Sequence, residues 1–278
     1  MSLATLDTRF PGKRAVITGG ASGLGLAAAE HLAARGWRLA LLDRDEASLS
    51  SASASLRAMG SPHCEAFNID TTDEAAVRFA VDSFAARLRG LDLAMNCAGV
   101  AVAGGLLETP PADWQWILQI NVMGVVHSCR AEIPHMLESG GGLVINVASA
   151  ASFASLGRMG AYNASKAAVV ALSETLVQEF AARGVDVAVA MTGFFRTRLM
   201  EHARAPADVL ADAAKLMHRS NLEAGPVARE ILERAAAGAT HIVLPASYRW
   251  LWRFKRLAPR YFLRSLARMQ REPAKRGG

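Results

Sequence analysis

Three residues in the middle of the chain, Ser149, Tyr162 and Lys166, have types and spacing that suit proton transfer beside a carbonyl carbon. Tyr162 and Lys166 are four residues apart, so they share one face if their segment is helical, as the apolar run that follows predicts. A free phenol titrates near pKa ~10, and a neighbouring ammonium lowers that pKa. The spacing therefore predicts that Lys166 activates Tyr162 as a base. The alternative is an ordinary helix with a surface tyrosine and lysine.

A buried strand is expected to position the serine. Residues 143–148 form a short apolar run, rich in β-branched side chains, which is typical of a parallel strand buried on both faces. Ser149 falls at the carboxyl end of this run. Open α/β sheets bind their ligands at that end of the strands, so the position favours a site group.

A glycine-rich turn lies near the amino terminus, between a predicted strand at 13–17 and a predicted helix at 26–34. Gly19, Gly23 and Gly25 occupy this turn. Glycines let the backbone approach a pyrophosphate closely, and the free amides at a helix start favour its negative charge. The context of strand, glycine turn and helix therefore predicts a dinucleotide site rather than a plain turn.

The end of the next predicted strand, 38–43, bears on the choice of dinucleotide. Asp43 closes this strand, and a carboxylate there suits the ribose 2′-hydroxyl of NAD. Arg44 follows, and a guanidinium could instead meet the 2′-phosphate of NADP. We expect NAD, with NADP as the alternative.

Strands and helices alternate along most of the chain. Further strands are predicted at 64–69, 91–95 and 185–191, with a long helical stretch at 114–136 that contains Asn121. Such alternation predicts right-handed crossovers and an α/β fold, a doubly wound parallel sheet with helices on both faces. Asn121 lies among apolar residues and is read either as a satisfied core amide or as a site group.

Composition limits the class of protein. The chain has 278 residues, 51% of them hydrophobic, which is enough for one large core. We expect a cytoplasmic protein because there is no signal-peptide pattern, no run long enough to span a bilayer, and only three scattered cysteines. No pair or triplet of its seven histidines has metal-ligand spacing, so no metal is predicted.

Taken in order, these motifs resemble the short-chain dehydrogenase/reductase family from about Pro11 to Leu244. The resemblance rests on the glycine turn, Asp70, Asn96 to Gly99, Asn121, Ser149, Tyr162, Lys166 and Gly193 at family spacing. It implies a Rossmann-like fold and a catalytic tetrad of Asn121, Ser149, Tyr162 and Lys166. In such a tetrad Ser149 hydrogen-bonds the substrate oxygen, Tyr162 exchanges a proton, Lys166 holds the nicotinamide ribose, and Asn121 anchors a relay water.

The resemblance also implies a set of cofactor contacts. Asp70 is expected near the adenine and Thr197 at the carboxamide. The full expected set is Gly19, Ser22, Gly23, Leu24, Gly25, Asp43, Arg44, Asp70, Thr71, Asn96, Ala98, Gly99, Tyr162, Lys166, Gly193 and Thr197.

Three departures from the family pattern stand out. Cys97 replaces a usual asparagine, and Thr192 replaces the proline that usually precedes Gly193. The ending common in tetrameric members is absent after Pro245. The resemblance implies a homodimer through the helices that hold Asn121 and Tyr162, or a higher homo-oligomer.

The expected substrate lid spans about 194–224. It is rich in large apolar side chains, which favours a hydrophobic alcohol or ketone. The same residues could equally serve only to pack the lid on the body. We expect an oxidoreductase that moves hydride between NAD and such a substrate. The alternatives are an NADPH-dependent carbonyl reductase, and a dinucleotide-sensing or membrane-surface binding protein that keeps the fold.

The carboxyl-terminal segment 248–278 stands apart from the catalytic domain expected at 1–247. It carries ten Lys/Arg against one acid, whereas the rest of the chain has a net charge of −3, so nucleic acid binding by the body is not expected. Bases recur at steps of three and four from 249 to 271, which predicts a basic amphipathic helix interrupted at Pro259. We expect its aromatic face to pack on the body or on a second subunit near the substrate mouth. Peripheral contact of 248–271 with an anionic membrane is the alternative.

Overall fold

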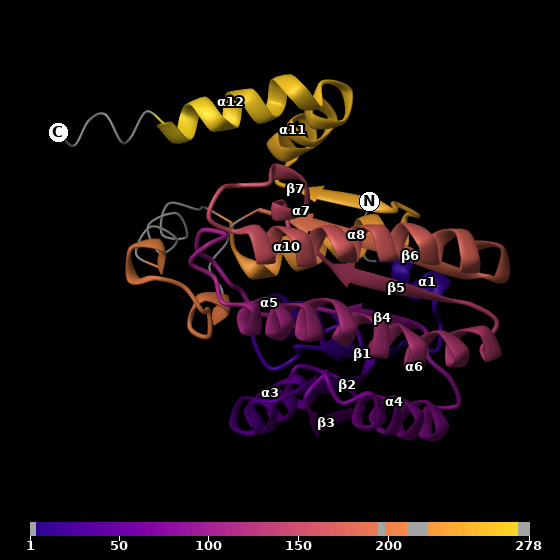
Figure 1. The fold of residues 1–278 in the computed structure, drawn as a ribbon. Helices are drawn as coiled ribbons and strands as arrows, with labels where there is room; N and C mark the ends of the chain where they lie inside the picture. Colours follow the sequence, from indigo (N-terminus) through magenta and orange to yellow (C-terminus); the bar gives the residue numbers. More distant parts are fainter. Residues whose placement is uncertain (1–3, 194–197, 211–221, 272–278) are drawn as a thin grey trace.

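The computed structural model describes residues 4–193, 198–210 and 222–271. Its centre is a parallel sheet of seven strands in the order β3-β2-β1-β4-β5-β6-β7 (Figure 1). The strands are β1 (Arg14–Thr18), β2 (Arg38–Asp43), β3 (Cys64–Asn68), β4 (Leu93–Asn96), β5 (Gly142–Val147), β6 (Val185–Thr192) and β7 (His241–Leu244). The doubly wound α/β fold predicted from the sequence is confirmed.

Helices cover both faces of the sheet, and each face has its own apolar core. One core joins α1 (Ala4–Arg9), α2 (Gly23–Ala33), α3 (Glu46–Ala58) and α10 (Ala224–Ala236) to the sheet. The other joins α4 (Glu74–Leu88), α6 (Gly124–Glu138) and α8 (Gly160–Phe180) to the opposite face. Every residue of β5 is buried, including Asn146, as the mainly apolar run predicts for a central parallel strand.

The strand order reverses between β1 and β4. From β1 the chain winds outward through β2 to β3, then returns to place β4 on the other side of β1. Loops that follow β1 and β4 therefore separate at the carboxyl end of the sheet and leave a crevice, which is where such sheets bind ligands. The glycine turn follows β1, and Ala98 and Gly99 follow β4.

The predicted helical stretch 114–136 is helical throughout but not uniform. α5 (Pro111–Leu118) passes into a π-helical turn, η1 (Gln119–Met123), before α6 begins at Gly124. A π turn inserts one extra residue per hydrogen-bonded ring and is found mainly at functional positions. Asn121 lies at the centre of this turn.

The basic tail forms two helices, α11 (Ala246–Leu257) and α12 (Pro259–Arg271), which meet at the predicted break before Pro259. Trp252 packs against the core of the α8 face, and its ring lies 5.3 Å from that of His241. Phe254 of α11 meets the buried ring of Phe262 edge-on at 6.0 Å. Part of the aromatic surface thus packs inward, as expected. Within the described residues, no helix combines the length and the apolar character needed to cross a membrane.

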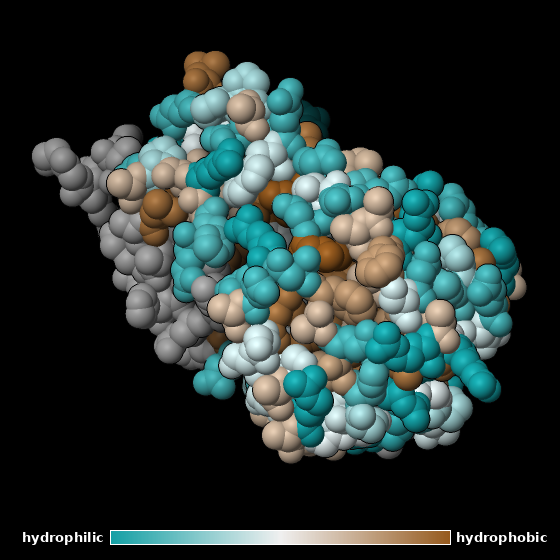
Figure 2. Space-filling model, turned by 90° about the horizontal axis from the view of Figure 1, so that it is seen from below, coloured by the Kyte–Doolittle hydropathy of each residue, from teal (hydrophilic) through white to brown (hydrophobic). Residues whose placement is uncertain are grey.

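The view from below, at the β3 edge of the sheet, shows a mainly hydrophilic surface (Figure 2). A hydrophobic patch lies near the centre of this face, surrounded by hydrophilic residues. The tail helices lie at the opposite edge, beside β7 (Figure 1).

Candidate active site

Ser149 and Tyr162 come together at the carboxyl end of β5. Ser149 directly follows the strand, and its Oγ accepts the backbone N–H of Ala151 at 3.1 Å. Tyr162 lies in the first turn of α8 and is buried. Burial raises the pKa of the Tyr162 phenol, and its hydrogen bond with Ser149 opposes that shift. The phenol is therefore held as a proton donor or acceptor partnered by a hydroxyl, away from bulk water.

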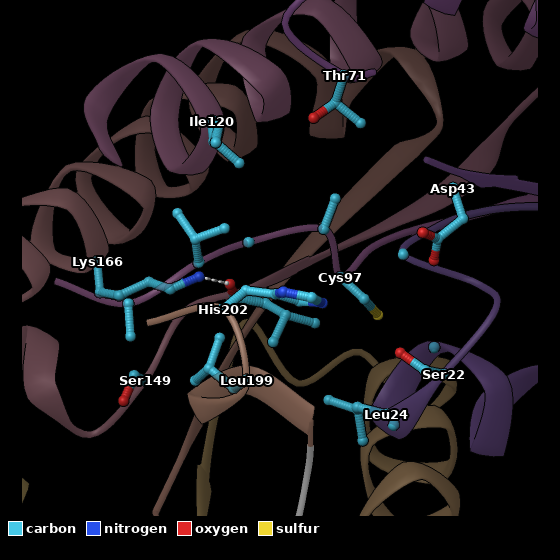
Figure 3. A pocket seen from close by; sticks show the side chains of 18 of the residues that line it. Ser22, Leu24, Asp43, Thr71, Cys97, Ile120, Ser149, Lys166, Leu199 and His202 are labelled. Carbon is cyan, nitrogen blue, oxygen red and sulfur yellow. Dashed lines mark hydrogen bonds between the residues drawn. The ribbon is translucent and has the colours of Figure 1, made fainter. Parts of the chain in front are cut away.

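Lys166 lies one helical turn after Tyr162, on the same face of α8. Its Nζ donates to the carbonyl of Val147 at 3.0 Å and lies 6.0 Å from the centre of the Tyr162 ring (Figure 3). Burial lowers the pKa of Lys166 to about 8. The shared helical face is as predicted. Within the described residues, Lys166 is not among the groups that shift the pKa of Tyr162, so its activation of the phenol stays a prediction.

Asn121 is buried, and both ends of its side-chain amide are hydrogen-bonded. Its Oδ1 accepts the backbone N–H of Val100 at 2.8 Å, and its Nδ2 donates to the carbonyl of Val100 at 3.0 Å and to Ser165 Oγ at 3.1 Å. The carboxamide thereby ties the loop after β4 to α8. A Cβ at Gly99 would lie 3.1 Å from Asn121 Oδ1 and 3.4 Å from Lys166 Nζ. Asn121, Gly99 and Lys166 are consequently immediate neighbours.

The glycine turn is closely packed, as a pyrophosphate cradle requires. Gly19 has φ +64° and lies against Ala98. A Cβ at Gly19 would be 2.9 Å from the backbone nitrogen of Ala98. A Cβ at Gly25 would be only 2.2 Å from the carbonyl oxygen of Gly19. The turn leads into α2 at Gly23, so the helix start faces the crevice. These features fit a bound dinucleotide phosphate.

Asp43 lies at the far end of the same crevice. Its Oδ2 accepts the backbone N–H of Ala21 at 3.1 Å, and its Oδ1 accepts that of Asp45 at 3.2 Å. Each carboxylate oxygen keeps a second lone pair, so the group can still accept from a ribose hydroxyl. Arg44 follows Asp43 on the same wall.

One continuous cavity of about 250 Å³ joins these features. Most of the residues predicted from the sequence line it, namely Gly19, Ser22, Gly23, Leu24, Gly25, Asp43, Arg44, Asp70, Thr71, Ala98, Gly99, Ser149, Tyr162, Lys166 and Gly193. Asn121 lies behind this wall, and Thr197 lies outside the described residues. One cavity thus holds both the predicted dinucleotide contacts and the predicted catalytic residues Ser149, Tyr162 and Lys166.

Asn96, another predicted cofactor contact, is not in the cavity wall. Its Nδ2 donates to Glu132 Oε2 at 3.1 Å and to Asn146 Oδ1 at 3.0 Å, all in the core between the sheet and α6. Burial raises the pKa of Glu132 to about 8. The structure therefore places Asn96 where it can fasten β4 to β5 and α6.

Several wall residues were not predicted as site residues. They are mainly apolar, and include Cys97, Val100, Ile120, Val147, Met159 and His202. Leu199 and Met200 also line the wall, and both belong to the apolar lid expected from the sequence. His202 reaches into the middle of the cavity (Figure 3). Burial raises the pKa of Cys97 to about 12, which keeps its thiol protonated. The one sequence signal for His202 is its place in the expected lid. Within the described residues, no three His, Cys, Asp or Glu side chains gather as metal ligands would.

Comparison with known proteins gives a consistent result. Residues 13–208 match the family model described as short chain dehydrogenase. The D-threitol dehydrogenase of Mycolicibacterium smegmatis is 39% identical over 181 residues, which cover 65% of this chain and 69% of that protein. The 2-dehydro-3-deoxy-L-rhamnonate dehydrogenase (NAD(+)) of a Sphingomonas strain is 36% identical over 185 residues, with coverages of 66% and 72%. Among solved structures, a short-chain dehydrogenase/reductase from Burkholderia phymatum in complex with NAD has TM-score 0.83 and 32% identity, with coverages of 89% and 94%.

Proposed function

Because the chain belongs to the short-chain dehydrogenase/reductase family, we propose that it is an NAD-dependent oxidoreductase acting on a secondary alcohol or the corresponding ketone. The observation that carries the proposal is the shared cavity. Ser149, Tyr162 and Lys166 line the same space as the glycine turn and Asp43. The NAD complex of the similar Burkholderia protein and the NAD(+) named for the Sphingomonas relative support the choice of cofactor.

The dinucleotide, when bound, would supply the chemistry of hydride transfer. The glycine turn and the start of α2 would hold its pyrophosphate, and Asp43 would accept from the adenosine ribose. Lys166 would bind the nicotinamide ribose with the protons of Nζ that Val147 leaves free. Asp70, Thr71, Ala98, Gly99, Gly193 and Thr197 complete the proposed contacts.

Tyr162 would act as general acid and base. Its hydroxyl is buried and hydrogen-bonded to Ser149, so both groups can address one substrate oxygen. During oxidation Tyr162 takes the proton of the alcohol, and during reduction it returns a proton to the ketone oxygen. Positioned proton transfer of this kind contributes roughly 10²–10⁴ in rate. Ser149 would orient the substrate oxygen, and Asn121 would hold the loop after β4 and anchor a relay water.

The apolar side chains of the cavity wall favour a hydrophobic substrate. They include Val100, Ile120, Met159, Leu199 and Met200, and none of these five carries a charge. Apolar and flexible side chains of this kind suit carbon skeletons with few polar groups. His202 adds one polar group that could address a second oxygen of the substrate.

Further parts of the proposal concern the whole molecule. We take residues 1–247 as the catalytic unit and 248–278 as its extension, and we propose a homodimer through the helices that hold Asn121 and Tyr162. Cys64, Cys97 and Cys129 are free thiols, which supports a reducing, cytoplasmic compartment. A reductase that prefers NADPH is favoured only by Arg44, beside Asp43.

A steady-state assay tests the proposed function. The full chain is mixed with NAD and a series of secondary alcohols and diols of increasing hydrophobicity, and NADH is followed by its absorbance. We expect kcat/KM to rise with the apolar surface of the substrate, and Ser149→Ala to lose most of the rate. Binding of NADH without oxidation of any alcohol or reduction of any ketone would favour a dinucleotide-sensing protein instead.

A further inference from the structure

The outer surface of the tail is the strongest feature that the catalytic proposal leaves unused. We propose that the pair of helices α11 and α12, residues 246–271, docks on the surface of an anionic lipid bilayer. The proposal does not depend on the chemistry of the cavity. It rests on the charge, the exposed apolar side chains and the position of this pair.

The charge of the helix pair has one sign. Residues 246–271 contain eight Lys and Arg and no acid. Arg260, Arg264 and Arg268 recur every four residues on α12, all are exposed, and within the described residues none of them meets a carboxylate. Only Arg249 of this pair forms an ion pair there, with Glu230 of α10 at 3.3 Å. These three arginines of α12 thus form a positive row that no carboxylate in the described part of the chain pairs with.

Large apolar side chains lie exposed among these arginines. Trp250 is 68% exposed, Leu257 86% and Tyr261 69%. The pair already buries other rings, since Trp252 faces the body and Phe262 faces α11. The exposed side chains are therefore additional to those that hold the tail in place. Exposed tryptophan, tyrosine and leucine next to arginine are typical of helices that lie in the membrane interface.

The composition of the surface favours lipid over nucleic acid. Arginine and aromatic rings would suit either partner, because phosphates are common to both. Leu257 and Leu263 decide between them, since exposed aliphatic side chains gain nothing from a nucleic acid groove and gain free energy on entering the acyl boundary of a bilayer. The net negative charge of the rest of the chain also opposes a polyanion that would extend over the body.

The pair is attached beside the cavity. Tyr248 lies against Gly193, a wall residue, and Lys255 Nζ donates to Ser155 Oγ at 3.1 Å, just after α7 (Ala151–Ala154). In Figure 1, α12 runs toward the same side of the molecule as the described lid residues 198–210. A bilayer that contacts α12 would therefore lie near the entrance to the cavity.

Sedimentation of the full chain with lipid vesicles tests the proposal. Vesicles of phosphatidylcholine alone are compared with vesicles that also contain phosphatidylglycerol. We expect binding to the anionic vesicles only, and release as salt shortens the Debye length from ~10 Å at 0.1 M to ~3 Å at 1 M. This salt titration needs no variant, so it stands even if a substituted chain fails to fold.

Two charge-reversal variants locate the surface. Each basic residue near an anionic surface is worth about fivefold in affinity, so R260E/R264E should bind at least ~30-fold more weakly. The matched control is R78E/R229E, which changes the net charge equally at two exposed positions on α4 and α10, and should bind as the parent does. L257S/Y261S, which keeps every arginine, should also weaken binding.

Four results would overturn the proposal. They are equal binding to neutral and anionic vesicles, equal loss in the control variant, binding of single-stranded DNA without binding of vesicles, and a change of oligomeric mass in R260E/R264E with vesicle binding intact. The last result would assign the surface to a second copy of the chain.

Discussion

The carboxylate of Asp43 accepts a hydrogen bond from the backbone N–H of Ala21 at 3.1 Å. One side chain at the end of β2 thereby shapes the glycine turn and lines the cavity that the turn opens into. Any substitution of Asp43 acts on both the turn and the ligand. The substitution that separates the two effects keeps an oxygen acceptor for Ala21 and removes the charge.

We predict that Asp43→Asn lowers the affinity for NADH by about tenfold and leaves the affinity for NADPH unchanged or higher. The oxygen of the amide can still accept from Ala21, whereas its nitrogen cannot accept from the N–H of Asp45. The variant also loses the charge-assisted bond to the ribose, worth ~1.5–3 kcal/mol. Fluorescence titration of both dinucleotides measures the change. Asp45→Asn is the matched control on the same wall. An equal loss for NADH and NADPH would mean that Asp43 acts only through the turn.

Tyr162→Phe is expected to lower kcat by roughly 10²–10⁴, the usual contribution of a positioned acid or base. The dissociation constant for NADH should stay close to that of the parent, because the ring and its packing are kept. Tyr261→Phe removes the hydroxyl of an exposed tyrosine and should leave kcat as it is. Turnover by Tyr162→Phe comparable to the parent would exclude the phenol as the proton-transfer group.

Glu132 should make the folded state less stable as pH rises from about 4.5 to about 8. The pKa of its buried carboxyl is raised from 4.5 to about 8, so across this window the folded chain holds a proton that the unfolded chain has released. The stabilisation is complete below the lower value and is lost as pH rises through the higher one.

Glu132→Gln replaces the titrating carboxyl by an amide that does not titrate. The variant should therefore lose the part of the pH dependence of stability that Glu132 causes. Urea unfolding at pH 5.5 and pH 8.5 measures the difference, and the variant should gain on the parent at the higher pH by an amount on the order of a few kcal/mol. The carbonyl oxygen of the introduced amide can still accept from Asn96, so the comparison changes charge more than shape. The same difference from the parent at both pH values would contradict the prediction.

Gly25→Ala is expected to abolish dinucleotide binding and destabilise the fold by about 1–3 kcal/mol, since its Cβ would lie 2.2 Å from the carbonyl oxygen of Gly19. Gly225→Ala is the control, because a Cβ there meets nothing within 4 Å and the residue lies in α10. That change should stabilise the chain by roughly 0.5–1 kcal/mol. Thermal unfolding with and without NADH reports both effects, and a stabilising shift by NADH in Gly25→Ala would refute the first.

The sheet and the glycine turn could be predicted from the sequence because each depends on local pattern. The apolar run of β5 has no other plausible place than a strand buried on both faces. Asn96 could not be placed in the same way, because an amide after a strand can turn to the cavity or to the core. The presence of Glu132 and Asn146 below it settles its direction, and neither is close to it in sequence.

Two further features depend on tertiary structure that residue types do not encode. The π turn around Asn121 differs from an α-helix by one residue in its hydrogen bonding, and the carboxamide's bonds to Val100 and Ser165 hold it from outside the helix. In the tail, the aromatic side chains lie on more than one side of α11. The spacing of aromatic and basic residues in the tail sequence therefore could not show that Trp252 packs on the body while Trp250 is exposed.

The close approach of Tyr248 to Gly193 limits how this protein can be rearranged by gene fusion or by engineering. A Cβ at position 193 would lie 2.8 Å from Cε2 of Tyr248 and 3.3 Å from Cδ of Pro245. The ring of Tyr248 therefore packs against the backbone of Gly193, in the space that a side chain at 193 would fill. The tail is positioned by this contact with the catalytic body as well as by its covalent connection. A chimera that carries 246–271 on another body would need a glycine at the equivalent place to seat Tyr248 in the same way.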